Sequence, residues 1–519
     1  MKTNILKYGL LAIVAGMVMS GCDDFLDTEQ LGVTSQDDFY QTDDEALEAL
    51  YGVYDKLQAD QVSNFQYKNV LSDDGQAGGA SRSDNSDGNQ LNEFTISPSN
   101  SVLETMFSHY YKMIYCANIL IEKVEADTDT KILCIAEAKF LRAYAYFELV
   151  TLWGPVPLVL ETLDVDNYNQ PNSTISELWA QIELDLEEAI PVLPLKSEQS
   201  DAEKARASKG AAQSLLGKAY LYQEKYDEAA DMFDTVINSG EYSLYPDFSM
   251  LTREVSEFGV ESIFEISYVA DRTSSSESTQ IHAYCGPRSG YFSAGTTGLS
   301  ESGWGFVNPL PGLREVFVEE GDEIRWKATV LNEEDLEEYG ASIRAADGNL
   351  PYGNDGLVRM KYGAFLDEIA ESEESYHEIG GTNYRLIRYG DVLLMAAEAH
   401  NRKASPNDTK ALSYINEVRD RVSLPHISVT GDELFEAIKK ERRMELAFEF
   451  VRFQDLVRWG DAETALADQG KTTSLGTYVD GVEQFYTNEN AGFKSYNNLM
   501  PFPDSEITVN PNITQNPGY

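Results

Sequence analysis

Apolar residues recur every three to four positions along much of the chain, which is the spacing of one face of an α-helix. Residues 42–57 show this pattern clearly, and they begin with a capping-box sequence in which Thr42 and Glu45 are spaced to bond each other's backbone. The same spacing predicts further helices at residues 102–124, 131–152 and 175–190. The predicted main element is therefore the α-helix.

One stretch, residues 210–241, has the residue pattern of a tetratricopeptide repeat, in which two antiparallel helices pack closely through small side chains. The matching positions are Leu216, Gly217, Tyr220, Ala229 and Phe233. Because such a pair buries its apolar face only against neighbouring pairs, more helix pairs are expected to stack on either side. The candidates are residues 102–152 and the pair that begins at Leu386 and Ala411.

The middle of the chain, about residues 243–385, has a different pattern. Glycine, serine and tyrosine are frequent there, and a short apolar run at 260–269 predicts a β-strand. Residues 282–312 form a long loop rich in glycine, serine and aromatic residues, and residues 72–90 form a second, polar loop. Loops of this length in a compact protein are usually functional or disordered. The chain therefore reads as two helical parts that flank a loop-rich part.

The first residues have the features of a secretory signal. Lys2 and Lys7 precede a short apolar run, and small residues precede Cys22. The run is shorter than the roughly 20 residues of a membrane-spanning helix, so residues 1–21 are predicted to be a cleaved signal peptide. A cysteine directly after the cleavage site resembles a bacterial lipoprotein signal, in which lipid is attached to Cys22. The alternative is an ordinary secreted protein with a chance cysteine at this position.

The net charge of the chain limits which classes of molecule it can bind. The 519-residue chain carries 40 Lys and Arg against 87 Asp and Glu, which gives a formal net charge of −47. A surface of this charge repels phosphate groups, so nucleic acid is excluded as a partner. With 42% hydrophobic residues, the chain nevertheless has the apolar content of a folded protein.

The sequence offers no constellation typical of an enzyme or a metal site. The five histidines are scattered, and no zinc-protease, nucleophile-elbow, Walker or dinucleotide motif occurs. A run from Ser83 resembles part of a calcium loop, but its twelfth position is Phe94 instead of a carboxylate. The cysteines after Cys22 have no paired spacing, so no disulfide framework is predicted; they are Cys116, Cys134 and Cys285. We therefore predict no cofactor, no metal site and no enzyme of these classes, whereas glycoside hydrolysis by a pair of carboxylates stays open at this point.

Residues 441–460, ERRMELAFEFVRFQDLVRWG, resemble the C-terminal signature of the RagB/SusD family. One position departs from it, because Phe450 stands where the family usually carries glycine. Other segments along the chain are also similar to landmarks of the family, and they occur in the order that the family has. They include residues 111–120, 137–159, 384–399 and 499–519. The resemblance covers essentially the whole mature chain.

This resemblance implies a mostly α fold, in which a superhelix of about four tetratricopeptide-like helix pairs packs against a loop-rich part with a few short strands. It also implies a lipid-anchored protein on the outside of the outer membrane, partnered by a SusC-like TonB-dependent transporter. The expected divisions are the signal peptide at 1–21 and one SusD-like unit at 22–519. Within this unit, we expect a helical part at 22–242 with the repeat near 210–241. A loop-rich ligand-binding part at 243–385 and a second helical part at 386–519 follow it.

The family resemblance places the ligand near the two long loops. Sugar binding requires aromatic rings that lie against sugar faces, with acids, amides or arginine beside them to bond hydroxyl groups. The aromatic candidates are Tyr284, Tyr291, Phe292 and Trp304, and the polar candidates are Asp73, Asp74, Arg82 and Asn85. For each of these residues, a structural role in the core or the loop is the alternative.

The expected function is capture of an oligosaccharide at the cell surface and its delivery to the transporter. Two alternatives stay open. In the first, the same lipoprotein binds a peptide or another small nutrient. In the second, the protein is a surface glycosidase, for which the only motive is the abundance of acidic residues, since carboxylate spacing in three dimensions is what such an enzyme needs.

Overall fold

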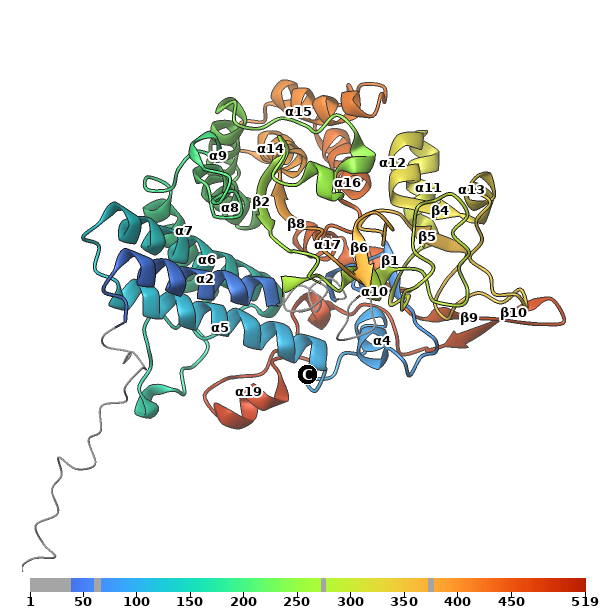
Figure 1. Cartoon of the computed structure of the whole chain (residues 1–519), viewed down its shortest axis with the longest axis horizontal. Helices are drawn as coiled ribbons and strands as arrows, with labels where there is room; N and C mark the ends of the chain where they lie inside the picture. Colours follow the sequence, from blue (N-terminus) through green and yellow to red (C-terminus); the bar gives the residue numbers. More distant parts are fainter. Residues whose placement is uncertain (1–38, 60–66, 272–276, 372–377) are drawn as a thin grey trace, which may run out of the picture.

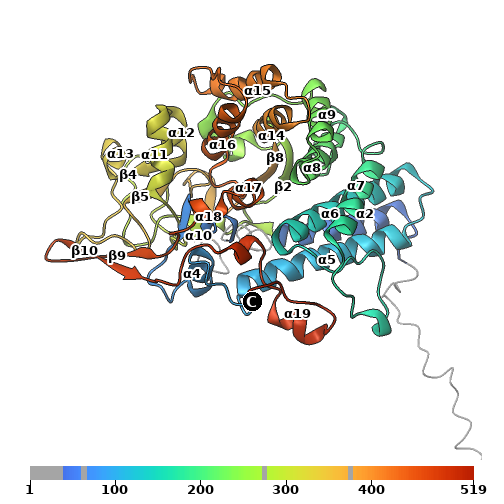
Figure 2. The ribbon, with the colours of Figure 1, turned by 180° about the vertical axis from the view of Figure 1, so that it is seen from behind.

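The structure of the protein is a computed structural model, and it describes residues 39–59, 67–271, 277–371 and 378–519. The predicted signal peptide and Cys22 lie outside the described residues. Helices dominate the fold, and the strands are short pairs (Figures 1 and 2). Within the described ranges, no helix combines the length and the apolar character that crossing a membrane requires.

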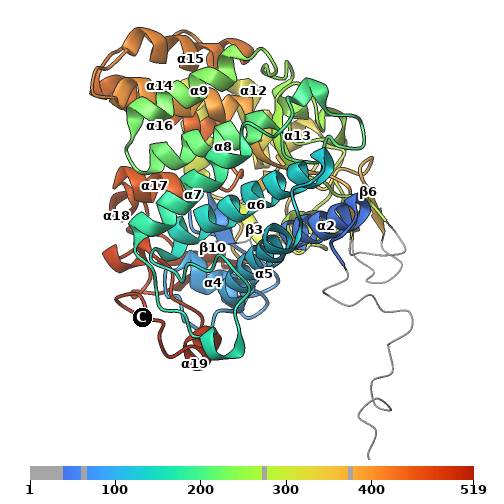
Figure 3. The same cartoon turned by 90° about the vertical axis from the view of Figure 1, so that its left-hand side faces the viewer.

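Helices from both ends of the sequence pack in succession into one curved row (Figure 3). Each helix of the row contacts the next, so helices far apart in the sequence, such as those before and after the loop-rich part, become neighbours. In order, the row contains α2 (Asp43–Ala59), α5 (Ser101–Lys123), α6 (Asp129–Trp153), α7 (Ile175–Ala189), α8 (Lys209–Tyr222), α9 (Tyr226–Asn238), α14 (Tyr389–Arg402) and α15 (Asp408–Arg421). Taken two at a time, these helices form the predicted superhelix of helix pairs. The pair expected at residues 102–152 is divided, because α5 pairs with α2 and α6 pairs with α7, whereas the pair expected from Leu386 and Ala411 is present as α14 and α15.

Local sequence explains where these helices begin and end. The Glu45 N–H donates to Thr42 Oγ1 at 3.2 Å while the Thr42 N–H donates to the Glu45 carboxylate at 2.9 Å, so the predicted capping box of α2 is confirmed. Thr174 and Glu177 form the same arrangement at the start of α7. Helix α6 ends at Trp153, and the next residue, Gly154, caps it with a φ of +74°, a conformation that glycine adopts without a Cβ clash.

The tetratricopeptide-like pattern corresponds to the antiparallel pair α8 and α9. Gly217 on α8 faces Phe233 on α9, and a Cβ built at Gly217 would lie only 2.6 Å from Cε1 of that ring. Both residues are buried. The glycine therefore lets the two helices approach until the Phe233 ring packs against the backbone of α8.

Replacing Gly217 by alanine is expected to destabilise the fold by about 1–3 kcal/mol, because the new methyl group overlaps the buried ring. Helix propensity acts in the opposite direction by only about 1 kcal/mol. Gly52 in α2 is the matched control, since a Cβ there meets no atom within 4 Å, and Gly52→Ala should raise the stability slightly. Urea denaturation measures both changes, and an unaltered or raised midpoint for Gly217→Ala would contradict the close approach of α8 and α9.

The loop-rich part consists of short strands and helices between α9 and α14, together with a segment from the N-terminal half. The predicted strand at 260–269 is present as β2, which pairs antiparallel with β8 and contacts α8. The elements are β1 (Gly75–Ala77), α4 (Ser86–Asn92), β2 (Ser262–Ile266), α10 (Ile281–Cys285), β3 (Val307–Pro309), α11 (Pro311–Glu320), α12 (Glu323–Thr329), β4 (Val330–Asn332), α13 (Glu333–Glu338), β5 (Leu357–Arg359), β6 (Ile369–Glu371), β7 (Glu378–Gly380) and β8 (Tyr384–Arg388).

The C-terminal part is helical at first and then changes character. A β-hairpin projects from the body at the right edge of Figure 1, and the chain end returns to α6, where Trp153 Nε1 donates to the Pro501 carbonyl at 2.9 Å. The elements are α16 (Asp432–Leu446), α17 (Arg452–Trp459), α18 (Ala462–Ala465), β9 (Thr472–Val479), β10 (Val482–Thr487) and α19 (Asp504–Val509).

Phe450, the position where the family usually carries glycine, has a φ of +68°. This left-handed conformation costs a residue with a Cβ about 1–2 kcal/mol, which explains the family's preference for glycine there. The Phe450 ring is buried, and its centroid lies 5.2 Å from that of Tyr384 and 6.2 Å from that of Tyr362. Burial of the ring among these tyrosines offsets the backbone strain.

Two hydrophobic cores are relevant to the site. The main core runs beneath the helix row, and a smaller core fills the loop-rich part. The small core contains Phe292, Ala294, Leu299, Leu331, Leu336, Ala341, Ile343, Leu350 and Val358. Cys116, Cys134 and Cys285 form no disulfide.

Candidate functional site

The two long loops meet through a pair of short strands. β1 from the first loop pairs antiparallel with β3 from the second, so that Gly75 lies opposite Pro309. The contact continues on both sides of the strands, because the Gly78 N–H donates to the Phe306 carbonyl at 3.2 Å and the Leu310 N–H donates to the Asp74 carbonyl at 2.9 Å. Segments more than 200 residues apart in sequence therefore lie side by side.

Three aromatic rings gather at this junction. The centroid of the Trp304 ring lies 4.6 Å from that of Tyr284 and 5.3 Å from that of Phe306, and the remaining pair is 5.6 Å apart. The rings are tilted or edge-on to one another, as aromatic clusters usually are. All three side chains are partly exposed, so they present an apolar surface to solvent.

A charged pair lies beside the rings. Arg288 Nη1 is 3.3 Å from Asp84 Oδ2, and the same nitrogen donates to the Trp304 carbonyl at 3.4 Å. A Cβ built at Gly79 would lie 3.0 Å from Asp84 Oδ2 and 3.2 Å from Cε1 of Phe306, which places the carboxylate next to the aromatic cluster. We call the set Tyr284, Trp304, Phe306, Asp84 and Arg288 the aromatic site.

The predicted residues Arg82 and Asn85 hold the first loop in shape. Arg82 forms a two-point ion pair with the buried Glu93, with an Nη2 to Oε2 distance of 2.8 Å, and its guanidinium carbon lies 4.3 Å from the centroid of Tyr486. Asn85 caps α4 by accepting from the Gly88 N–H at 3.2 Å, and its amide donates to the Phe306 carbonyl at 3.3 Å. Asn85 thus fixes the backbone that carries one of the three rings.

Asp73 and Asp74 are bonded to arginines of the C-terminal signature. Arg452 donates to both carboxylate oxygens of Asp73 at 2.8 and 2.9 Å, and Arg443 Nε donates to Asp74 at 2.7 Å. Burial raises the pKa of Asp74, whereas burial of Asp73 is outweighed by Arg452 and Arg443, which lower the pKa of that carboxyl. Both acids therefore tie the first loop to α16 and α17, and we do not include them in the aromatic site.

The remaining two predicted residues lie in a different place. The expectation that Phe292 is an exposed ring does not hold, because its side chain is only 5% exposed and packs in the small core. The backbone there bonds to another loop through Ser293 and Ser342, which turns the ring inward. Tyr291 is half-buried, its N–H donates to the Arg288 carbonyl at 3.1 Å, and among the described residues no ring contact joins it to the aromatic cluster.

Sequence reasoning did not single out Phe306, Asp84, Arg288 or Tyr486. A signal for Phe306 was present, because it lies two positions after Trp304 in the same glycine-rich, aromatic run. Asp84 and Arg288 lie within the two loops but have nothing in the local sequence that distinguishes them. Tyr486 comes from the β9–β10 hairpin, which no local pattern connects to the first loop.

The aromatic site suits a ligand with apolar faces and hydroxyl groups. Its rings offer a surface for the faces, the Asp84 carboxylate accepts hydrogen bonds, and the Arg288 guanidinium donates them. In the part of the chain that the structure describes, no three His, Cys, Asp or Glu side chains gather into a group that would hold a metal ion.

The chain matches two protein-family models. One, described as the SusD family, matches residues 260–519, and the other, described as starch-binding associating with outer membrane, matches residues 24–221. A sequence relative, SusD-like protein P2 of Formosa agariphila, is 26% identical over 99% of this chain and 100% of its own length.

Solved structures give the same result. A laminarin binding SusD-like protein is 32% identical and superposes with a TM-score of 0.79, over 92% of this chain and 100% of that chain. Surface glycan-binding protein A from Bacteroides fluxus is 26% identical, with a TM-score of 0.75 over 92% of this chain and 100% of that chain. These two relatives are named as binding proteins. Because a family model covers half of the chain and a relative above 30% identity covers nearly all of it, the chain belongs to the SusD/RagB family.

Proposed function

We propose that this protein is a lipid-anchored, cell-surface protein that captures an oligosaccharide at the aromatic site and delivers it to a SusC-like TonB-dependent transporter of the outer membrane. The observation that carries the proposal is the cluster of Tyr284, Trp304 and Phe306 beside the Asp84–Arg288 pair. Membership of the SusD/RagB family and the likeness to a laminarin binding member support a glycan as the ligand.

The chemistry of the aromatic site accounts for reversible capture. If one sugar face removes about 100 Å² of apolar surface from water, its burial contributes about 2.5 kcal/mol. Two or three such contacts, less the cost of association, correspond to dissociation constants in roughly the millimolar to micromolar range. Ligand that is held with this strength also leaves again, which delivery to a transporter requires.

The charged pair of Asp84 and Arg288 would set the orientation of the bound sugar. Neighbouring hydroxyl groups of a sugar ring act as donors and acceptors at once, so a carboxylate and a guanidinium placed side by side bond two of them together. Asp84 and Arg288 provide this combination at the edge of the rings. The rings would then select for a sugar with an apolar face, and the charged pair would select for the orientation of its hydroxyls.

A binding screen tests the proposal. We expect isothermal titration calorimetry to detect binding of at least one of laminarihexaose, cellohexaose and maltohexaose, with no release of reducing sugar on prolonged incubation. A protein that binds none of these glycans but binds peptides from a casein digest would favour the peptide alternative instead. Release of reducing sugar by the purified protein would favour the glycosidase alternative.

The anchor is tested separately, because the proposal for Cys22 rests on the sequence around it. Replacing Cys22 by serine should abolish incorporation of radiolabelled fatty acid and release the protein from the membrane fraction, since attachment depends on the buried acyl chains. Cys116→Ser is the control that keeps the label, because Cys116 is a half-buried residue of α5. If the Cys22→Ser protein still incorporated the radiolabelled fatty acid, Cys22 would not be the residue that carries the lipid.

A further inference from the structure

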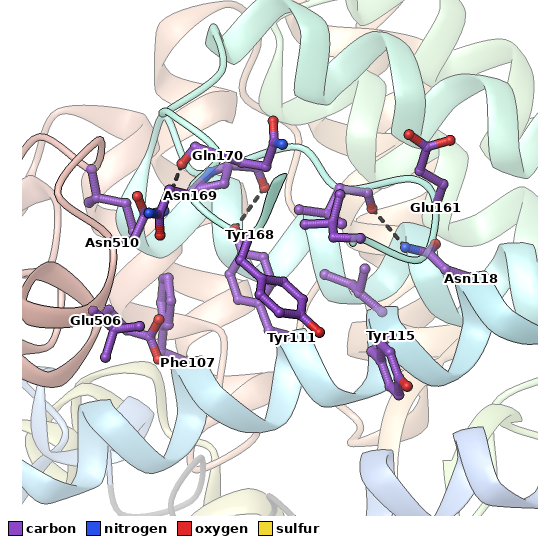
Figure 4. A pocket seen from close by; sticks show the side chains of 16 residues that line it. Phe107, Tyr111, Tyr115, Asn118, Glu161, Tyr168, Asn169, Gln170, Glu506 and Asn510 are labelled. Carbon is purple, nitrogen blue, oxygen red and sulfur yellow. Dashed lines mark hydrogen bonds between the residues drawn. The ribbon is translucent and has the colours of Figure 1, made fainter. Parts of the chain in front are cut away.

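A second pocket lies apart from the aromatic site, between α5, the chain that follows α6, and α19 (Figure 4). Its volume is about 260 Å³, close to the lower end of the roughly 300–1,000 Å³ of small-molecule sites. None of the residues of the aromatic site lines it. We call it the tyrosine pocket, after Tyr111, Tyr115 and Tyr168.

The tyrosine pocket has a floor of aromatic rings. Phe107, Tyr111 and Tyr115 are spaced four residues apart on α5 and therefore lie on one side of this helix. Tyr168 comes from the opposite wall, and Figure 4 shows it in front of Tyr111. Tyr115 and Tyr168 are 55% and 60% exposed, so a ligand in the pocket can reach both rings.

Hydrogen bonds fix the walls in place. The Tyr111 hydroxyl donates to the Pro157 carbonyl at 2.7 Å, and the Asn118 amide donates to the Val159 carbonyl at 3.0 Å. On the other side, the Asn510 amide donates to the Gln170 carbonyl at 2.8 Å. The pocket is therefore formed before a ligand arrives, which lowers the entropy lost on binding.

The polar groups of the pocket define the ligand. Glu161 and Glu506 contribute carboxylates, and the residues that line the pocket include neither lysine nor arginine. The half-buried Glu506 side chain forms no hydrogen bond or ion pair with another described residue. Burial, with the nearby Glu104 charge, raises the pKa of Glu506. Acceptors without cations favour a neutral ligand that brings its own donors, and they disfavour phosphate, sulfate and carboxylate ligands.

We infer that the tyrosine pocket is a second carbohydrate site that takes one or two units of a neutral sugar, with the rings of Tyr115 and Tyr168 against the sugar and Glu506 accepting from its hydroxyls. This inference extends the proposed glycan capture but depends on different residues. Two sites on one protein that bind the same polysaccharide raise its avidity, because binding at one site holds the chain near the other.

Saturation-transfer NMR tests the inference in the full-length Trp304→Ala variant, in which the aromatic site is impaired. The probes are laminaribiose, cellobiose and maltose, with glucose 6-phosphate as the anionic comparison. We expect a signal from at least one neutral disaccharide and none from glucose 6-phosphate. Adding Tyr115→Ala and Tyr168→Ala should reduce the disaccharide signal to background, whereas adding Tyr51→Ala should not, because Tyr51 is a comparably exposed tyrosine of α2 outside the pocket.

The outcomes separate the two proposals. A disaccharide signal that survives loss of Tyr115 and Tyr168, or that is already absent in Trp304→Ala, overturns the second site. A signal that is equal in the wild type and Trp304→Ala but depends on Tyr115 and Tyr168 overturns the aromatic site and supports the second one. A crystal structure with a peptide segment in the pocket, from this chain or from another protein, also overturns the inference.

Discussion

Replacing Trp304 by alanine is expected to weaken oligosaccharide binding by roughly 70-fold, because the loss of one sugar contact of about 100 Å² removes about 2.5 kcal/mol. Trp304 is the ring that contacts both Tyr284 and Phe306, so its removal also disturbs the surface that the other two present. The measurement is isothermal titration calorimetry with the hexasaccharide that binds the wild type most tightly.

Two variants control this result. Trp304→Phe keeps a flat apolar ring and should retain binding within about tenfold, whereas Tyr291→Ala should change binding little, because Tyr291 stands apart from the aromatic cluster. Since Trp304 is partly exposed, the melting temperature of Trp304→Ala should fall by only a few degrees. If a folded Trp304→Ala protein bound the oligosaccharide with wild-type affinity, the aromatic site would not be where the oligosaccharide binds.

Replacing Arg388 by methionine is expected to destabilise the fold by about 3–5 kcal/mol, because three buried carboxylates lose the cation that they share. The cations that remain are Arg421 beside Glu261 and Glu445, Arg325 beside Glu445, and Lys361 beside Glu449. Arg388 lies 2.7 Å from Glu261, 2.6 Å from Glu445 and 2.6 Å from Glu449, and all four side chains are buried. The free energy of unfolding is measured by chemical denaturation. This ion-pair cluster joins β8 to the C-terminal signature, whose arginines in turn hold the first loop of the aromatic site.

An exposed ion pair is the matched control for Arg388. Lys327 lies 2.9 Å from Glu323 on the surface of α12, and Lys327→Met should change the free energy of unfolding by less than about 1 kcal/mol. If Arg388→Met were no more destabilising than Lys327→Met, the buried cluster would not support the fold in the way we describe.

The same cluster determines how the protein responds to acid. Burial favours the protonated form of Glu445, but Arg421, Arg388 and Arg325 lower its pKa well below the usual 4.5. The pKa of Glu449 is also lowered despite burial, by Arg388 and Lys361. Carboxyl groups with a lowered pKa contribute stability above the pKa of the unfolded chain, and this stability is lost as the pH falls through the folded-state value. In an acid titration, the Arg388→Met protein should therefore begin to unfold at a higher pH than the wild type does.

The helical part of the fold could be predicted from sequence because its signals are local. The capping box at Thr42 and the apolar periodicity that follows it lie within 16 residues, and α2 begins one residue after Thr42. Gly217 and Phe233 were recognised in the same way, as a repeat whose spacing reflects direct contact.

The loop-rich part could not be predicted to the same extent, since its contacts join distant segments. The pairing of β1 with β3 and the bonds from Arg452 to Asp73 connect residues hundreds of positions apart, and no local pattern indicates them. The sequence also did not show which aromatic side chains are buried. Phe292 and Trp304 lie in similar glycine-rich and serine-rich surroundings, but Phe292 packs in the small core and Trp304 belongs to the partly exposed cluster. The family resemblance identified the two loops, and the side chains that face solvent became visible only in three dimensions.

A crystal structure of the protein with its tightest-binding hexasaccharide tests the central claim most directly. The account predicts sugar rings against Tyr284, Trp304 and Phe306, with hydroxyl groups bonded to Asp84 and Arg288. Sugar bound only elsewhere on the surface, with these rings left in contact with water, would contradict it.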